Sequence, residues 1–197
     1  MAYKAAIIGC HGVGKTTLVK QLADKFKVFG ELSINSFMGH DNFLSEIKII
    51  TDNILLNKKI GETAADSISD RFAFLDALIY SEAFYTMGWI SDEQLKTIYS
   101  VVNNSKHCWT YPEKILVMND SKNVIMRNIL KRGRDPKLNE TDKKFLEVTL
   151  QYFNDFFTGH LEFKMLKHEI RDRLMNIPKF EIRCGEPVNN VLNILNN

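Results

Sequence analysis

The most informative stretch of the sequence is Gly9-Cys10-His11-Gly12-Val13-Gly14-Lys15-Thr16. It fits the pattern of glycine, four residues of any type, glycine, lysine, and then serine or threonine. Glycines let the backbone fold tightly, so that successive N–H groups converge on phosphate oxygens. Lys15 is expected to reach the outer phosphates of a nucleoside triphosphate, and the Thr16 hydroxyl is expected to coordinate Mg²⁺. The stretch therefore predicts a phosphate-binding loop.

The segments on both sides of this loop support the same interpretation. Residues 5–8 form a short apolar run that is typical of a buried parallel strand. After the loop, Leu18, Leu22 and Phe26 recur at a spacing of four, which predicts an amphipathic helix. The N-terminus of a helix adds free N–H groups and a partial positive charge beside the phosphates. We therefore expect ATP with Mg²⁺ to bind at His11, Gly12, Val13, Gly14, Lys15, Thr16 and Thr17.

The rest of the chain alternates short apolar runs with longer helical patterns, which is typical of α/β proteins. Further strands are expected at residues 27–29, 64–69, 115–118 and 180–183. Helices are expected at about residues 42–57, 72–87, 121–132, 141–157 and 161–175, with others opening at Ser91 and after Pro187. Hairpin signals are lacking in the sequence. We therefore expect a parallel sheet covered by helices on both faces, that is, a three-layer α/β/α arrangement.

Composition restricts the possible partners and location. The 26 Lys and Arg residues nearly balance the 24 Asp and Glu residues, so neither nucleic acid nor an anionic membrane is expected as the main partner. No stretch approaches the roughly 18 apolar residues of a membrane span, and no signal peptide precedes the first strand. Three widely spaced cysteines suggest neither a disulfide framework nor a zinc site. We expect one cytoplasmic domain over residues 1–197.

A second candidate feature is the pair Asp70-Arg71, which follows the strand expected at residues 64–69. An aspartate at a strand end can bind Mg²⁺ directly or through water. An adjacent arginine can hold a phosphate or the acceptor end of a substrate. Asp76 lies in the helix expected at about residues 72–87 and is a candidate substrate contact, although it could equally pair with a lysine. Such an Asp-Arg pair is also common as a plain surface ion pair.

A third feature is a basic segment at about residues 127–140. Between Lys122 and Lys144 the sequence has eight Lys and Arg residues and only three Asp and Glu residues. Within this segment, Arg132 and Arg134 flank Gly133. A basic segment broken by glycine suits a helical lid that closes over the transferring phosphates and excludes water. Basic residues at a helix end are also compatible with simple solvation.

The loop alone does not distinguish a kinase from a GTPase or a motor ATPase. Residues 119–122 follow an expected strand and do not fit the Asn-Lys-x-Asp pattern that reads guanine. An acidic pair at the end of an apolar strand, as in motor ATPases, is also missing from the sequence. Together with Asp70-Arg71 and the basic segment, this favours a small-molecule kinase.

The order of these motifs resembles the deoxynucleoside kinase and thymidylate kinase group of P-loop kinases. The resemblance covers about residues 4–158 and rests on the loop, on Asp70-Arg71 opening an apolar helix, and on Arg132-Gly133-Arg134. It implies the P-loop NTPase fold with a five-stranded parallel sheet, and ATP as the phosphoryl donor. The acceptor would be a nucleoside or a nucleoside monophosphate. The group often forms dimers through helices beside the sheet, and the apolar run 72–87 could serve as such a surface.

The resemblance also implies roles for single residues. Glu31 matches a carboxylate after the second strand that accepts the proton of the acceptor hydroxyl, although Asp70 could orient that hydroxyl instead. Asp70 would be linked to Mg²⁺, Arg71 would hold the acceptor, and Asp76 would help to form the base pocket. Catalytic roles are thus expected for Lys15, Glu31, Asp70, Arg71, Arg132 and Arg134.

Departures from the pattern leave two alternatives open. Deoxynucleoside kinases usually have an upstream lid arginine at the position of Asn128, and here Arg127 lies one residue away. An ATP-binding regulatory protein with a degenerate kinase site is therefore one alternative. The other is a kinase of the nicotinamide riboside type, which the loop with His11 and the helix with Tyr80 also resemble.

Overall fold

The computed structural model describes residues 2–30, 41–132 and 141–196 of the chain. The strands of this part form one parallel sheet in the order β2-β3-β1-β4-β5. Their bounds are β1 Tyr3–Ile8, β2 Lys27–Phe29, β3 Ser67–Asp70, β4 Lys114–Asn119 and β5 Lys179–Arg183. The predicted five-stranded parallel sheet is therefore confirmed, with β1 in its centre.

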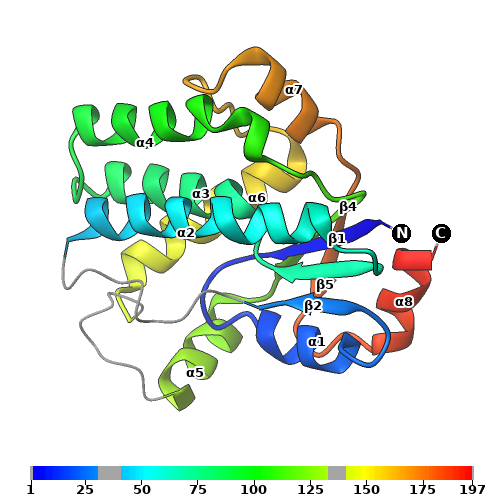
Figure 1. Ribbon diagram of the computed structural model, residues 1–197. Coiled ribbons are helices and arrows are strands. Elements are labelled where there is room, and N and C mark those ends of the chain that lie inside the picture. The colour runs from blue at the N-terminus through cyan, green and yellow to red at the C-terminus, as the bar shows by residue number, and fades with distance from the viewer. Residues whose placement is uncertain (1, 31–40, 133–140, 197) are drawn as a thin grey trace.

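Helices cover both faces of this sheet, as Figure 1 shows. Helices α1 and α8 lie on one face, and α2, α3, α4, α6 and α7 lie on the other. The bounds are α1 Lys15–Leu22, α2 Asn42–Glu62, α3 Ala73–Thr86, α4 Asp92–Asn104, α5 Lys122–Arg132, α6 Lys143–Thr158, α7 His168–Met175 and α8 Val188–Asn196, with a short 3-10 helix η2 at Lys106–Cys108. The three-layer α/β/α prediction is confirmed. None of the described helices is long and apolar enough to cross a membrane.

Several element boundaries differ from the sequence prediction. Helix α1 ends at Leu22, so Phe26 lies outside it, and β3 spans Ser67–Asp70 instead of residues 64–69. Helix α2 continues to Glu62, five residues beyond the expected end, because its buried face continues through Asn57 and Ile60. Helix α7 begins at His168 instead of residue 161. Leu161 and Phe163 both enter the core although they are only two residues apart, a spacing that one face of a helix cannot provide.

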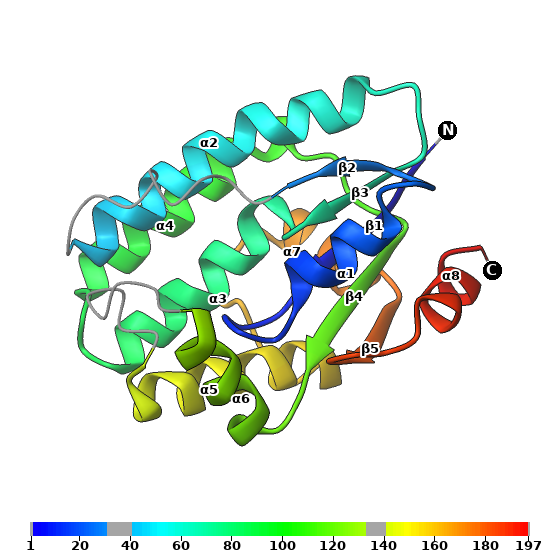
Figure 2. The ribbon, with the colours of Figure 1, turned by 90° about the horizontal axis from the view of Figure 1, so that it is seen from below.

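Helix α3 is buried on almost all sides, with 11 of its 14 residues in the interior. It packs against α2, α4 and α6, and α2 runs beside α4 in both ribbon views (Figures 1 and 2). Phe74 and Phe84 are core residues, as is Phe72 just before the helix, whereas Tyr85 is exposed. The prediction that residues 72–87 supply a dimer surface is therefore wrong, because these side chains are already used inside the monomer.

The register of β1 and β3 brings the two main sequence motifs together. Ile7 of β1 lies beside Asp70 of β3, and the N–H of Arg71 donates to the Ile7 carbonyl at 2.9 Å. The phosphate loop leaves the end of β1, and the Asp-Arg turn leaves the end of β3. Since both strands are parallel, the two motifs meet at the carboxyl edge of the sheet, where ligands bind in open α/β folds.

Candidate active site

The phosphate loop is shaped by glycines and covered by α5. Gly12 has φ of 79° and Gly14 has φ of 100°, both in the left-handed region that favours glycine. A Cβ atom on Gly12 would lie 2.6 Å from Cγ1 of Ile129 and 2.9 Å from the carbonyl oxygen of Ile125. Glycine is therefore required at position 12 for two reasons: the left-handed backbone angle and the close contact with α5.

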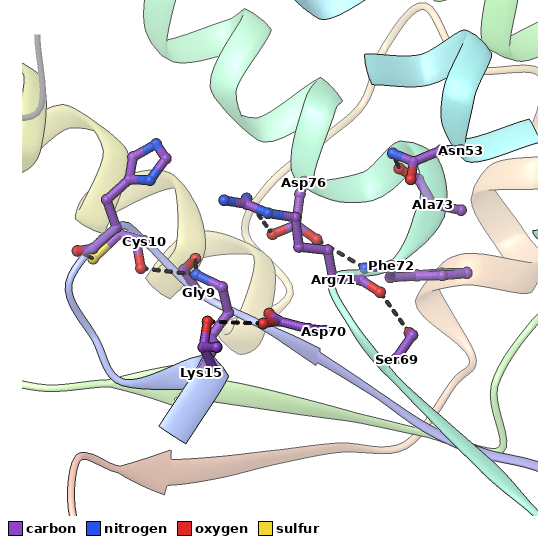
Figure 3. Close-up of polar contacts among 12 residues, drawn as sticks. Gly9, Cys10, Lys15, Asn53, Ser69, Asp70, Arg71, Phe72, Ala73 and Asp76 are labelled. Atoms are coloured by element: carbon purple, nitrogen blue, oxygen red, sulfur yellow. Dashed lines mark hydrogen bonds and ion pairs between the residues drawn. The ribbon is translucent and has the colours of Figure 1, made fainter. Parts of the chain in front are cut away.

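Lys15 is buried within the curve of the loop. Its Nζ donates hydrogen bonds to the carbonyl oxygens of Gly9 at 2.6 Å and of Cys10 at 3.0 Å (Figure 3). Burial lowers the pKa of Lys15, and the nearby Arg71 lowers it further, whereas the carboxylate of Asp70 acts in the opposite direction. The ammonium group is thus held at the position where the loop would receive phosphate oxygens.

Thr16 and Asp70 form the candidate metal site. The Thr16 hydroxyl donates to Oδ2 of Asp70 at 3.0 Å, and Oδ1 of Asp70 is buried without a hydrogen-bond partner among the described residues. Mg²⁺ is usually held by one or two protein oxygens together with phosphate oxygens and water. No group of three or more His, Cys, Asp or Glu side chains suited to a metal occurs in the described part of the chain. One hydroxyl and one orphaned carboxylate oxygen therefore fit Mg²⁺ that is bound together with a nucleotide.

The turn after Asp70 has an unusual backbone conformation. Arg71 has φ of 90° and Ala73 has φ of 34°, which is costly for residues with a Cβ atom. Three side chains support this turn, as Figure 3 shows. Ser69 Oγ donates to the Arg71 carbonyl at 2.5 Å, Asn53 Nδ2 donates to the Ala73 carbonyl at 2.7 Å, and Asp76 Oδ2 accepts from the Phe72 N–H at 2.9 Å.

Arg71 is held by groups from α3. Its Nη1 lies 3.5 Å from Oδ1 of Asp76, and its guanidinium carbon lies 5.7 Å from the ring centre of Tyr80. Burial raises the pKa of Asp76, and the charges of Arg71 and Lys15 oppose that rise. The His11 ring lies 4.8 Å from the Tyr80 ring, so the phosphate loop also contacts α3. Arg71 is therefore positioned beside the loop by a buried ion pair and an aromatic ring.

Sequence reasoning missed two polar residues on the buried face of α2, Glu46 and Asn53. Both are buried, at 3% and 5% exposure. They are seven residues apart and therefore share a helix face, together with Asn57. Polar residues at that spacing, on the same face as Ile50 and Ile60, were the available signal. Burial raises the pKa of Glu46 to about 8, with Arg71 acting against the rise and Asp76 adding to it.

A cavity of about 390 Å³ lies beside the phosphate loop, on the side of α5 and the segment after β5. It is lined by parts of the loop and α1, by Met118, Asn128 and Lys131, and by residues 182–186. Asn128 Nδ2 donates to the Gly12 carbonyl at 2.9 Å, whereas Arg127 is exposed. At the position where a lid arginine was expected, the asparagine therefore supports the loop.

Some predicted site residues cannot be placed relative to this site. Glu31 and Arg134 lie outside the described residues, as does the lid segment 133–140. Arg132 is the last residue of α5, the helix that contacts the loop. Of the other predicted catalytic residues, Lys15, Asp70 and Arg71 all lie at the carboxyl edge of the sheet.

Comparison with known proteins agrees with this geometry. Three solved structures of deoxyadenosine kinase from M. mycoides, with bound dATP, with bound dCTP, and with the products dCMP and a flexible dCDP, match 98% of this chain and 98% of their own. Their TM-scores are 0.77, 0.76 and 0.76, at 18%, 17% and 18% sequence identity, so they show a shared fold. No curated protein gives a significant match. The family model for deoxynucleoside kinase matches residues 5–193, and the chain therefore belongs to the deoxynucleoside kinase family.

Proposed function

We propose that this nucleoside kinase transfers the terminal phosphoryl group of ATP, bound with Mg²⁺, to a hydroxyl group of a deoxynucleoside. The observation that carries the proposal is the meeting of Lys15, Thr16, Asp70 and Arg71 at the ends of β1 and β3. Family membership supports a nucleoside as the acceptor. The relatives of similar fold are described with dATP, dCTP and dCMP, which suits a deoxynucleoside.

The donor phosphates would be held by the loop at residues 11–17 and by the buried ammonium of Lys15. Thr16 and Asp70 would hold Mg²⁺, since they present a hydroxyl and a carboxylate oxygen without another partner among the described residues. When bound there, Mg²⁺ neutralises charge that develops on the phosphate oxygens. The cavity beside Asn128 and residues 182–186 has room for the remainder of the donor nucleotide.

Arg71 would hold the reacting end of the acceptor, next to the loop. Asp70 already accepts from Thr16 and is assigned to the metal, so we assign the proton-accepting role to Glu31. This residue follows β2, which pairs with β3 and ends on the same edge of the sheet. Arg132 and Arg134 would act from a lid at about residues 127–140, within a single domain spanning residues 1–197. A cytoplasmic homodimer fits the family resemblance, with a surface other than α3.

The decisive experiment measures ADP release from MgATP in the presence of a panel of nucleosides and nucleoside monophosphates. We expect at least one deoxynucleoside to raise turnover many-fold, and Lys15→Ala to abolish that turnover. Stimulation by a monophosphate alone would replace the nucleoside acceptor with a thymidylate kinase-like one. If ATP binds and no acceptor raises turnover, the regulatory alternative replaces the kinase proposal.

The two alternatives raised by the sequence are not favoured. A family model for deoxynucleoside kinase matches nearly the whole chain, which argues against a kinase of the nicotinamide riboside type. A degenerate site would be expected to have lost contacts. Here Lys15 bonds to the Gly9 carbonyl, Thr16 donates to Asp70, and Asn128 supports the loop.

A further inference from the structure

Arg71 keeps a strained backbone conformation in the turn after β3. Its φ of 90° lies in the left-handed region, which is costly for a residue with a Cβ atom. The N–H of Arg71 is fixed by the Ile7 carbonyl at 2.9 Å, so a relaxation of φ would move the atoms beyond that N–H, including Cβ. The direction of the guanidinium therefore depends on what holds the carbonyl of the same residue.

The Arg71 carbonyl is held by the hydroxyl groups of Ser69 and Tyr3, which we call the hydroxyl pair. Ser69 Oγ donates to this carbonyl at 2.5 Å (Figure 3), and since a carbonyl can only accept, the single proton of the serine hydroxyl is used there. The Tyr3 hydroxyl forms a second hydrogen bond with the same Oγ. Because the serine proton is already committed, Tyr3 donates and Ser69 accepts. The two hydrogen bonds therefore run in one direction, from β1 through β3 to the turn.

The hydroxyl pair lies in the interior of the protein. Ser69 is 1% exposed and Tyr3 is 7% exposed. The Tyr3 ring packs edge-on against Phe72, at 6.5 Å between the ring centres. Burial raises the pKa of Tyr3, so the tyrosine keeps the proton that it donates. Water has little access to this position, and loss of the serine hydroxyl would leave the Arg71 carbonyl without its side-chain donor.

The neighbouring Ser67 shows that the pairing is selective. Ser67 is the strand partner of Tyr3, and it lies on the same face of β3 as Ser69 because side chains alternate along a strand. The Ser67 hydroxyl is nevertheless buried without a hydrogen-bond partner among the described residues. The Tyr3 hydroxyl thus extends past the serine beside it to the serine that holds the turn.

We propose that Tyr3 and Ser69 are positioning residues of the phosphoryl transfer, because together they fix the backbone of Arg71 and so keep its guanidinium beside the phosphate loop. The inference rests on the proposed function and adds two residues that act through Arg71. Asp76 and Tyr80 contact the guanidinium end of Arg71, whereas the hydroxyl pair holds its backbone end. A displacement of about 1 Å at a reacting centre can cost about 100-fold in rate, so the contact affects catalysis as well as folding.

The test compares kcat and KM in the ADP-release assay with the deoxynucleoside that gives the highest turnover. For Ser69→Ala we expect kcat to fall about tenfold or more, while the KM for MgATP stays within about twofold because the phosphate loop is unchanged. Tyr3→Phe removes only the first hydroxyl and should lower kcat by at most the same factor. The double variant should be no slower than Ser69→Ala, because both substitutions break the same connection to Arg71.

Two variants control for the loss of a buried hydroxyl group as such. Ser67→Ala removes an equally buried serine hydroxyl from the same strand, and its kcat should equal that of the wild type. Tyr99→Phe removes a buried tyrosine hydroxyl that donates to Glu82, further along α3. It should lower the urea midpoint as Tyr3→Phe does, with an unchanged kcat. A loss of stability without any loss of kcat in Ser69→Ala and Tyr3→Phe would reduce the hydroxyl pair to a structural role and overturn the proposal.

A second measurement observes Arg71 itself and does not depend on turnover. In protein labelled with ¹⁵N-arginine, the Nε–H signal of Arg71 is assigned by its loss in Arg71→Lys. We expect this signal to shift or broaden in Tyr3→Phe and Ser69→Ala and to keep its position in Ser67→Ala. A signal that is the same in all three variants contradicts the proposal.

The outcomes separate this inference from the proposed function. If the wild type is active and Tyr3→Phe keeps the wild-type kcat, or if the double variant is slower than Ser69→Ala, the inference is overturned while the kinase remains. If no nucleoside raises ADP release from the wild type, the proposed function fails and the inference fails with it.

Discussion

The Thr16 hydroxyl donates a hydrogen bond of 3.0 Å to Oδ2 of Asp70 and so joins the phosphate loop to the Asp-Arg turn. The two residues are 54 positions apart in the sequence. Their contact follows from the parallel pairing of β1 and β3, which sets Ile7 beside Asp70. Two motifs that each suggest phosphate chemistry thus become parts of one site.

Replacing Asp70 by asparagine tests the metal assignment. The substituted amide would still accept from Thr16 but would lack the negative charge that attracts Mg²⁺. For Asp70→Asn we expect nucleoside-dependent turnover to fall at least about 100-fold and the Mg²⁺ concentration for half-maximal rate to increase. Titration of Mg²⁺ in the ADP-release assay measures both. The control Asp92→Asn, at an exposed position on α4, should behave like the wild type. An unchanged Mg²⁺ requirement in Asp70→Asn would show that Asp70 does not bind the metal.

Removing the charge of Arg71 should destabilise the protein as well as inactivate it. Arg71→Met leaves the carboxylate of Asp76 buried without its partner, a change that typically costs about 3–5 kcal/mol. Urea unfolding monitored by circular dichroism gives the change in the free energy of unfolding. The control Arg171→Met removes a partly exposed side chain with only a long ion-pair contact and should change stability by less than about 0.5 kcal/mol. Equal stability of the two variants would show that Asp76 does not depend on Arg71.

Asn53 supports the strained turn through the carbonyl of Ala73. In Asn53→Ala this buried carbonyl loses its donor, so we expect a loss of about 1–3 kcal/mol in the free energy of unfolding. The kcat of the variant should fall too, because Arg71 is then less well positioned. Asn154→Ala, an exposed change on α6, serves as the comparison for both measurements. Wild-type stability in Asn53→Ala would mean that Ser69 and Asp76 suffice to hold the turn.

Burial of Glu46 should make the free energy of unfolding fall as pH rises. The folded protein keeps the proton up to a pKa of about 8, whereas an unfolded glutamate releases it near 4.5. Between these values the unfolded state binds fewer protons, so stability falls with increasing pH, by roughly 3–5 kcal/mol in total. Glu46→Gln removes this dependence.

The corresponding measurement compares urea midpoints at pH 5 and pH 8. The advantage of Glu46→Gln over the wild type should be larger at pH 8, while the exposed variant Glu93→Gln should follow the wild type at both values. A constant difference between Glu46→Gln and the wild type would indicate that Glu46 is ionised throughout.

Sequence patterns predicted the local elements well where one physical signal dominates. The apolar run of β1, the glycines of the loop and the spacing of Leu18 and Leu22 gave the correct strand, turn and helix. The apolar run 72–87 was correctly predicted as a helix but misassigned as a surface. Hydrophobicity alone does not tell whether a helix is covered by its own chain or by a second copy, and here α2, α4 and α6 cover it.

The chemistry of the loop is encoded in contiguous residues, because a tight glycine turn, a lysine and a hydroxyl need only short-range geometry to form a phosphate site. Asp70 and Arg71 were identifiable for a similar reason, as a charged pair at the end of a strand. The roles of Ser69, Asn53 and Glu46 depend instead on contacts between elements distant in the sequence. Strand register places Ser69 and Asp70 next to the loop, and the packing of α2 on α3 buries Glu46 near Arg71 and Asp76. Only tertiary packing turns an ordinary helical glutamate into a carboxyl group that keeps its proton, because the loss of water depends on what surrounds it and not on its neighbours in the chain.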